Sequence, residues 1–111
     1  MDRQKVLSLL GLCRKAGKAG FGHDAALSAV RSNSAHLCLL SQDASERLEK
    51  EFRRVCAGDG RKIAVQRLPM SMEEIGAATG LPSAVLTIND MGFCELIAQQ
   101  ISSCGEDLYD Q

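Results

Sequence analysis

The stretch LLGLCRKAGKAGFGHDAALSAVR, residues 9–31, decides the fold of this chain. It carries apolar residues at helical spacing, then a turn with glycines at positions 17 and 20, and then a second helix that begins at Gly22-His23-Asp24. The first amides of a helix have no partner inside it, so they suit a phosphate or the edge of an RNA base. Three cations lie just upstream of this helix start: Arg14, Lys15 and Lys18. The stretch therefore predicts two helices around a Gly-rich turn and points towards nucleic acid.

Segments typical of strands and helices alternate along the rest of the chain. Asp2 is expected to cap the first helix, and Ser71 with Glu74 has the spacing of a capping box. The other expected elements are a very short strand at 18–21, a buried strand at 36–41, a charged helix from Ser41 or Asp43 to about Cys56, a second core strand at 62–67, a short helix after Ser71, a strand at 84–88, and a final helix from Asn89 or Asp90 to about Ser103. This alternation predicts an α/β fold, a three-layer α/β/α sandwich with a small, mostly parallel or mixed sheet.

Length and composition bound the class of protein. A chain of 111 residues forms one domain, which we expect to span residues 3–103, with a frayed acidic tail at 104–111. No apolar run has membrane length, and the N-terminal helix contains Arg3 and Lys5, unlike a signal peptide. The sequence therefore predicts a cytoplasmic protein without a membrane partner.

Charge is distributed unevenly along the chain. Residues 1–31 contain six Lys or Arg and two acidic residues, whereas residues 89–111 contain five acidic residues and no Lys or Arg. The net charge of −1 argues against a strongly basic protein that coats RNA. The chain thus has a basic start and an acidic end, an asymmetry that chance alone also produces in a chain this short.

The residue types needed for catalysis or metal binding are not brought together by any motif. The five cysteines form no CxxC pair and are interpreted as reduced thiols used as small apolar residues. His23 and His36 are the only histidines, and neither has a cysteine partner that the sequence reveals. GxSxG, P-loop and HExxH motifs are absent from the sequence. We therefore predict no enzyme, no metal site and no cofactor.

Two further features bear on RNA binding, and each has a second interpretation. The loop Leu81-Pro82-Ser83-Ala84 is small and apolar, so it could cover an unstacked nucleotide or simply connect a helix to a strand. The cations at 14–18 could meet phosphates or complement the dipole of their own helix. Aromatic residues make up only 4% of the chain, which argues against a sheet that stacks bases on aromatic side chains.

The order of these elements, together with three motifs, resembles a known family. The motifs are GLCRKAGK at 11–18, LLSQDAS at 39–45, and Ile75-Gly76 with Thr79-Gly80. Over residues 3–101 the chain is similar to the bacterial, YlxQ-like branch of the L7Ae, L30e and S12e ribosomal-protein family. This resemblance implies an α/β/α sandwich that binds kink-turn RNA. It further implies that the second helix enters the major groove beside sheared G·A pairs through residues 21–28, and that the loop at 81–84 covers a flipped nucleotide.

The start of the second helix departs from the family pattern at two positions. The family usually reads Gly, a small residue, Asn, Glu, and then Lys three positions on; Gly22 matches this pattern. Asp24 stands in place of the asparagine amide, and an ionised carboxylate can only accept hydrogen bonds. Ser28 stands in place of the lysine and removes a positive charge from the groove. Each lost contact would weaken binding by about 1–3 kcal/mol.

We therefore expect a non-enzymatic, ribosomal-protein-like module that binds structured RNA, such as ribosomal RNA, as a monomer or weak oligomer. One alternative is a protein-interaction module that kept the fold and lost kink-turn specificity, with its acidic last helix as a docking face. A second alternative is an enzyme, such as the partner subunit of an RNA-modifying enzyme. The residues expected to meet RNA are Arg14, Lys15, Lys18, Phe21, Gly22, His23, Asp24, Ser28, Arg31, Leu81, Pro82, Ser83 and Ala84.

Overall fold

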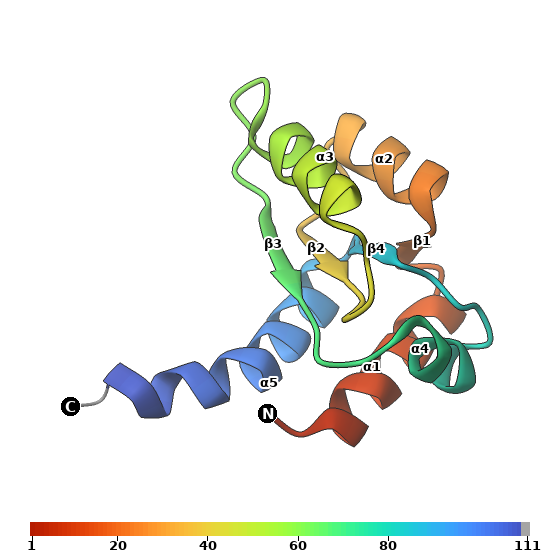
Figure 1. The fold of residues 1–111 in the computed structure, drawn as a ribbon, viewed down its shortest axis with the longest axis vertical. Helices are drawn as coiled ribbons and strands as arrows, with labels where there is room; N and C mark the ends of the chain where they lie inside the picture. The colour runs from red at the N-terminus through yellow and green to blue at the C-terminus, as the bar shows by residue number, and fades with distance from the viewer. Residues whose placement is uncertain (110–111) are drawn as a thin grey trace.

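The computed structural model describes the backbone of residues 1–109 and the side chains of residues 1–101. Helices and strands follow in the order α1 (Arg3–Lys15), β1 (Ala19–Phe21), α2 (His23–Arg31), β2 (Leu37–Leu40), α3 (Glu46–Ala57), β3 (Ala64–Arg67), α4 (Met72–Thr79), β4 (Val85–Ile88) and α5 (Met91–Tyr109) (Figure 1). This order confirms the alternation inferred from the sequence. The helix α5 continues beyond the end expected near Ser103, and residues 110 and 111 of the expected acidic tail lie outside the described residues.

The four strands form one mixed sheet in the order β1-β4-β2-β3. The strand β4 runs antiparallel to both its neighbours, so that Thr87 pairs with Gly20 of β1 and with Cys38 of β2. The strands β2 and β3 run parallel. The sheet is therefore mixed, which is one of the two arrangements that the sequence left open.

Helices cover both faces of the sheet. Side chains alternate between the faces of a strand. In β2, Leu37 and Leu39 join one core, whereas Cys38 and Leu40 join the other. The helices α1, α4 and α5 cover the first face and α2 and α3 cover the second, and Figure 1 shows these two groups on opposite sides of the strands. The predicted three-layer α/β/α sandwich is confirmed.

The two cores differ in the size of their side chains. The first core, under α1, α4 and α5, consists mainly of large aliphatic residues: Val6, Leu10, Leu37, Leu39, Leu68, Met70, Ile75, Leu86, Ile88 and Ile97, with Cys13. The second core, under α2 and α3, consists mainly of small residues around one buried aromatic: Ala26, Ala29, Val30, Ala35, Cys38, Leu40, Ala44, Phe52, Cys56 and Val85. The helices of the second face therefore have less side-chain bulk between themselves and the sheet.

Two of the predicted helix caps are present. The Asp2 carboxylate accepts a hydrogen bond from the Lys5 amide at 3.1 Å, which satisfies one of the free donors at the start of α1. At the start of α4, the Ser71 hydroxyl accepts from the Glu74 amide at 3.1 Å while the Glu74 carboxylate accepts from the Ser71 amide at 2.9 Å. This reciprocal pair is the predicted capping box.

The start of α3 differs from the prediction. Ser45, and neither Ser41 nor Asp43, caps this helix, because its hydroxyl accepts from the Leu48 amide at 3.1 Å. The Ser41 hydroxyl donates instead to the Asp43 carboxylate at 2.7 Å, and that carboxylate also accepts from the Met72 amide at 3.1 Å. The two predicted caps therefore hold the β2–α3 connection against α4.

The strand β3 is also not the core strand that the sequence predicts. It lies at the edge of the sheet with β2 as its neighbour. Ala64 and Gln66 are exposed, and Val65 and Arg67 are only partly buried. A short apolar run gives no information about which strands will lie beside it, so an edge position could not be distinguished from a central one.

Candidate nucleic-acid interface

The start of α2 presents free backbone amides. Gly22 precedes the helix with φ at 96° and ψ at 168°, a conformation that L side chains rarely adopt. Its amide donates to the Val85 carbonyl at 2.9 Å, and its carbonyl accepts from the Ala26 amide at 2.9 Å, which is the first bond of the helical ladder. The amides of residues 23–25 precede that ladder, and Gly22 brings no side chain that could bond to them. This helix start can therefore offer N–H donors to an anion or a base edge.

Gly20 sets the position of α2 against the sheet. A Cβ atom on Gly20 would lie 2.9 Å from the carbonyl oxygen of Ala25 and 2.9 Å from the hydroxyl oxygen of Thr87. A side chain here would push the first turn of α2 away from β1 and β4. The glycine therefore fixes where the start of α2, with its free amides, lies against the sheet.

The loop between α4 and β4 lies beside the start of α2, since the Gly22 amide bonds to the first residue of β4. Leu81 is 38% exposed, Pro82 is exposed, and Ala84 is partly buried. Ser83 is buried, and its hydroxyl donates to the Leu81 carbonyl at 3.3 Å. The Ser83 side chain thus shapes the loop, while Leu81 and Pro82 form its outer surface.

Arg14 links the end of α1 to the same loop. One nitrogen of its guanidinium donates to the Thr79 carbonyl at 3.1 Å, at the end of α4. Lys15 follows at the end of α1 and is exposed, with no ion-pair partner among the described residues. Figure 1 shows the end of α1, the start of α2 and the α4–β4 loop on one side of the molecule. Arg14 and Lys15 therefore supply positive charge to that side.

Two of the residues predicted to bind RNA lie apart from this group, and the side chain of a third packs against the core. Lys18 lies at the far end of β1, where its carbonyl accepts from the Asn89 amide at 2.8 Å. Arg31 is the last residue of α2, about 12 Å along the helix from His23 at 1.5 Å per residue. Phe21 packs partly buried against the first core. The structure thus brings only part of the predicted set together.

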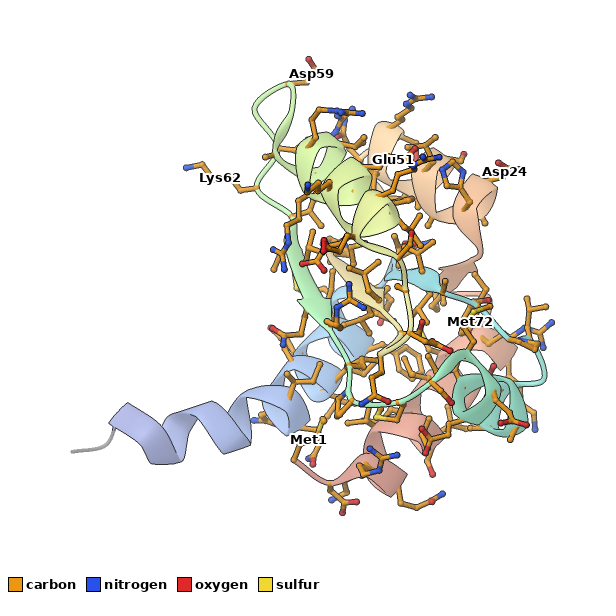
Figure 2. The ribbon with its side chains drawn as sticks, in the orientation of Figure 1. Met1, Asp24, Glu51, Asp59, Lys62 and Met72 are labelled. Carbon is orange, nitrogen blue, oxygen red and sulfur yellow. The ribbon has the colours of Figure 1, made fainter. Side chains whose placement is uncertain are left out.

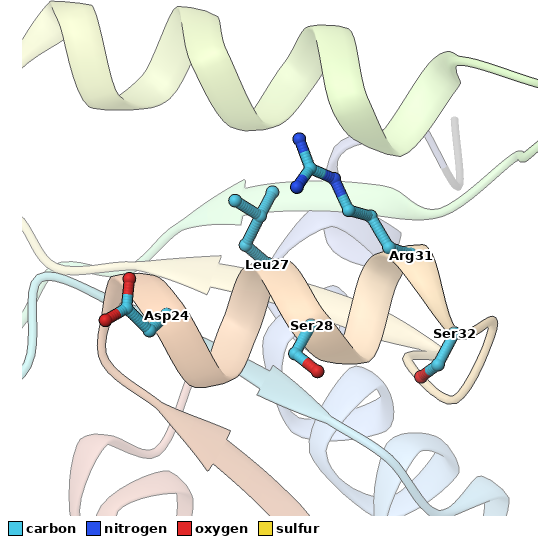
Figure 3. A pocket seen from close by; sticks show the side chains of 5 residues that line it. All are labelled: Asp24, Leu27, Ser28, Arg31 and Ser32. Atoms are coloured by element: carbon cyan, nitrogen blue, oxygen red, sulfur yellow. The ribbon is translucent and has the colours of Figure 1, made fainter.

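The outer side of α2 carries a shallow hollow. Its lining residues are Asp24, Leu27, Ser28, Arg31 and Ser32, and its volume is about 450 Å³. Figure 3 shows Asp24 near the start of the helix and Arg31 near its end, with Ser28 between them. The side chain of Asp24 is fully exposed. The hollow therefore has an acidic end beside the free amides and a basic end away from them.

The contact that holds His23 was not predictable from the sequence. Its Nε2 atom lies 2.9 Å from a Glu51 carboxylate oxygen on α3, its Nδ1 atom lies 3.5 Å from Asp24, and its ring meets Phe52 edge-on with centroids 5.5 Å apart. Hydrogen bonding to Glu51, and then to Asp24, raises the pKa of His23 above its usual value of 6.5. When it is protonated, the imidazole offsets the charge of the two carboxylates that it contacts, Asp24 on α2 and Glu51 on α3. Glu51 is 28 residues away in the sequence, so no local pattern signals this contact.

The buried cysteines have the environment of apolar core residues. Burial, and to a smaller extent Asp90, raises the pKa of Cys13 to about 11. A hydrogen bond with Cys56, together with burial, raises the pKa of Cys38. Within the described residues no group of three His, Cys, Asp or Glu side chains could hold a metal ion. None of the described helices is both long and apolar enough to cross a membrane.

Comparison with known proteins gives consistent results. Residues 4–97 match the model of the ribosomal protein L7Ae/L30e/S12e/Gadd45 family. The RNA-binding protein YlxQ of Enterococcus faecium is 30% identical over 98 residues, which is 85% of this chain and 88% of that protein. A protein of unknown function from Bacillus halodurans superposes with a TM-score of 0.78 at 29% identity, over 88% of this chain and 97% of the other.

A more distant structure shares the fold. The 15.5 kD RNA-binding protein of Giardia lamblia superposes with a TM-score of 0.67 at 19% identity, over 90% of this chain and 84% of the other. The family match and the YlxQ relative confirm the YlxQ-like resemblance, and they bear out the prediction of a non-enzymatic protein. The chain belongs to the ribosomal protein L7Ae/L30e/S12e/Gadd45 family.

Proposed function

We propose that this chain is a cytoplasmic RNA-binding protein that recognises bent, kink-turn-like RNA in association with the ribosome or with translation. The observation that carries the proposal is the gathering of the free amides of α2, the α4–β4 loop and Arg14 on one side of the molecule. The relative from Enterococcus faecium, an RNA-binding protein 30% identical over 98 residues, supports RNA as the ligand.

The start of α2 reads the RNA through its backbone. The amides of residues 23–25 donate to base edges or phosphates, and the helix dipole favours negative charge at the same place. Gly22 has no atom within 4 Å of the position that a Cβ would take, so the backbone is open to a close ligand. Because these donors are fixed by the fold, they recognise the shape of the RNA more than its overall charge.

The α4–β4 loop supplies an apolar cover for an unstacked nucleotide. Leu81 and Pro82 form its outer surface. The Pro82 ring packs so closely on α4 that a Cβ atom on Gly76 would lie 2.7 Å from it. The loop is therefore held in place before any ligand arrives, and ordering it adds little to the cost of binding.

Asp24 and His23 give this helix start a base preference of its own. The Asp24 carboxylate accepts hydrogen bonds only, so it favours a base edge that presents an amino donor, such as N4 of cytosine. The imidazole of His23, when protonated, limits the repulsion between this carboxylate and the phosphates. Asp24 therefore changes which base is preferred at one position, and the amides retain the readout of shape.

Titration of the protein with a kink-turn RNA, beside a duplex of the same length without the bulge, tests the proposal. Each RNA is measured at two salt concentrations. We expect tight binding to the kink-turn alone, with an affinity that falls as salt rises. Equal weak binding to both RNAs, or binding to neither, would overturn it.

A second candidate function is protein docking on α5. Met91 and Leu96 are 53% and 50% exposed on this helix, and Glu95 lies between them as an exposed acid. Exposed apolar side chains on either side of an acidic one suit a partner protein that offers both apolar and basic side chains. Two results together would favour this function. The protein would show no preference for kink-turn RNA, and it would bind ribosomal proteins in a way that Leu96→Glu abolishes.

A further inference from the structure

Three cations share one side of α3. Arg47, Lys50 and Arg54 stand at positions i, i+3 and i+7 of this helix, which places them on one face. All three are exposed, and none has an ion-pair partner among the described residues. Together with Glu51 they line a shallow hollow of about 540 Å³. These three residues are called the α3 basic face below.

The acidic residues of α3 do not neutralise this face. Glu51 lies within it, but its carboxylate is bound by His23 at 2.9 Å. Glu49 bonds to Arg53 at 2.8 Å on another side of the helix. Glu46 lines a second hollow together with Glu49, Lys50 and Arg53, and within the described residues it forms no ion pair with Lys50. Although α3 alternates in charge along the sequence, the contacts leave one of its faces positive.

The α3 basic face is continuous with the start of α2. Figure 2 places Glu51 between α3 and α2, where it meets His23. The two helices lie side by side, since Arg61 donates to the carbonyls of Arg31 on α2 and Val55 on α3, at 3.4 and 3.5 Å. Arg31 extends from the end of α2 towards α3 (Figure 3). An elongated anion seated on the free amides of α2 would therefore continue over α3.

We propose that the α3 basic face binds backbone phosphates of an RNA stem that continues from the bend held at α2. This inference rests on the proposed function. From Arg47 to Arg54 the face spans about 10 Å at 1.5 Å per residue. One strand of a double helix carries one phosphate per roughly 3.4 Å of its axis, so the face matches about three phosphates in a row. Such contacts position the RNA and add salt-dependent affinity without reading its sequence.

A pair of double variants with equal changes in charge tests the inference. Arg47→Gln/Lys50→Gln removes two exposed cations from α3; neither forms an ion pair among the described residues, and Arg47 lies in the first turn, where a cation opposes the helix dipole. Lys5→Gln/Lys62→Gln removes two exposed cations, likewise without ion-pair partners among the described residues, from α1 and the α3–β3 connection. Both variants and the unchanged protein are titrated with a kink-turn RNA that carries either short or extended stems, over a range of salt.

The extended-stem RNA is expected to separate the two variants. Loss of two phosphate contacts lowers the slope of log affinity against log salt by about 1.5–2 and weakens binding at 0.1 M salt by at least ~10-fold. The variant Lys5→Gln/Lys62→Gln is expected to bind this RNA as the unchanged protein does. With the short-stem RNA, which does not reach α3, all three proteins are expected to bind alike. Adding Arg54→Gln to the first variant should lower the slope for the extended-stem RNA once more.

Failure of the inference differs from failure of the proposed function. If the unchanged protein binds the bent RNA tightly and Arg47→Gln/Lys50→Gln binds the extended-stem RNA with the same slope, the inference falls and the proposed function stands. An equal loss in both variants shows a general effect of net charge and also overturns the inference. If the unchanged protein binds neither RNA, the proposed function falls and the inference with it.

Discussion

The two faces of the sheet are built from different side chains and contribute differently to stability and to the proposed RNA contacts. The face under α1, α4 and α5 is filled with Leu, Ile and Met, the residues that contribute most apolar area to a core. The face under α2 and α3 is filled mainly with Ala, Cys and Val. The first face thus supplies much of the fold's stability. The second has less apolar area, but it brings two helices close together and carries most of the proposed RNA contacts.

Small residues on the second face have a direct structural consequence. Gly20 allows α2 to approach β1 so closely that a Cβ atom there would lie 2.9 Å from the Ala25 carbonyl oxygen. Among the described side chains, Phe52 is the one aromatic residue in the buried part of this face, and its ring contacts His23 at the start of α2. A single buried ring therefore couples the packing of α3 to the helix start that we propose as the RNA contact.

The largest expected effect comes from removing a large side chain from each face. Phe52→Ala should lower the free energy of unfolding by about 3–5 kcal/mol and Leu10→Ala by about 2–5 kcal/mol, because both side chains are fully buried. Urea denaturation measures both changes. At a temperature at which each variant remains folded, only Phe52→Ala should weaken RNA binding, since it alone frees the His23 ring. Equal weakening in both variants would break the proposed division between the faces.

A smaller effect is expected at the glycine that opens α2. Gly22→Ala places a residue with a Cβ atom at a backbone φ of 96° and should lower the free energy of unfolding by about 1–3 kcal/mol. Gly58→Ala is the control, because the φ of Gly58 is −81° and its Cβ position makes only ordinary contacts. The control should be neutral or stabilise the fold by up to about 1 kcal/mol. RNA affinity should fall in the first variant only; an unchanged affinity in Gly22→Ala would argue against a role for the α2 amides.

Loss of the capping box on the first face should lower stability without affecting RNA binding. Ser71→Ala removes the hydroxyl that accepts from the Glu74 amide and should cost about 1 kcal/mol, measured by thermal or urea unfolding. Its RNA affinity should not change, because the start of α4 lies at the opposite end of that helix from the loop at 81–84. A fall in affinity larger than the fall in stability would instead place the start of α4 in the interface.

The smallest expected effect is a pH dependence from His23. Because Glu51 and Asp24 raise the pKa of His23 above 6.5 in the folded protein, its ion pairs contribute stability that is fully present below pH 6.5. That contribution is lost as the pH rises through the raised pKa. The stability difference between the unchanged protein and His23→Gln should therefore shrink between pH 6 and pH 8, as urea denaturation at several pH values would show. A difference that grows with pH would contradict the assigned ion pairs.

Local signals in the sequence predicted most of the elements and part of the proposed site. The Asp2 cap and the capping box at Ser71 are local patterns, and both are present. Sheet order could not be predicted, because the alternation of strands and helices does not show that β4 lies between β1 and β2. The cap of α3 was wrong for a similar reason, since Asp43 bonds to a residue of α4 that lies 29 positions away.

The proposed site likewise contains one part that local sequence shows and another that depends on how the helices pack. The free amides of α2 follow from Gly22 and the helix after it, and the sequence shows both. The pairing of His23 with Glu51 depends on how α2 packs beside α3, and it engages the one acidic residue that lines the hollow of the α3 basic face. The α3 basic face could not be predicted from the alternating charges of this helix, because sequence spacing does not reveal which acidic residues already have partners.

Amide chemical shifts during titration with kink-turn RNA would test the central proposal most directly. If the α2 start and the α4–β4 loop form the RNA contact, the largest shifts should fall on residues 23–25 and 81–84, with smaller shifts along α3. The same RNA without its bulge should leave these amides nearly unmoved. Shifts confined to α5, or shifts spread equally over all exposed Lys and Arg positions with both RNAs, would contradict recognition by the start of α2.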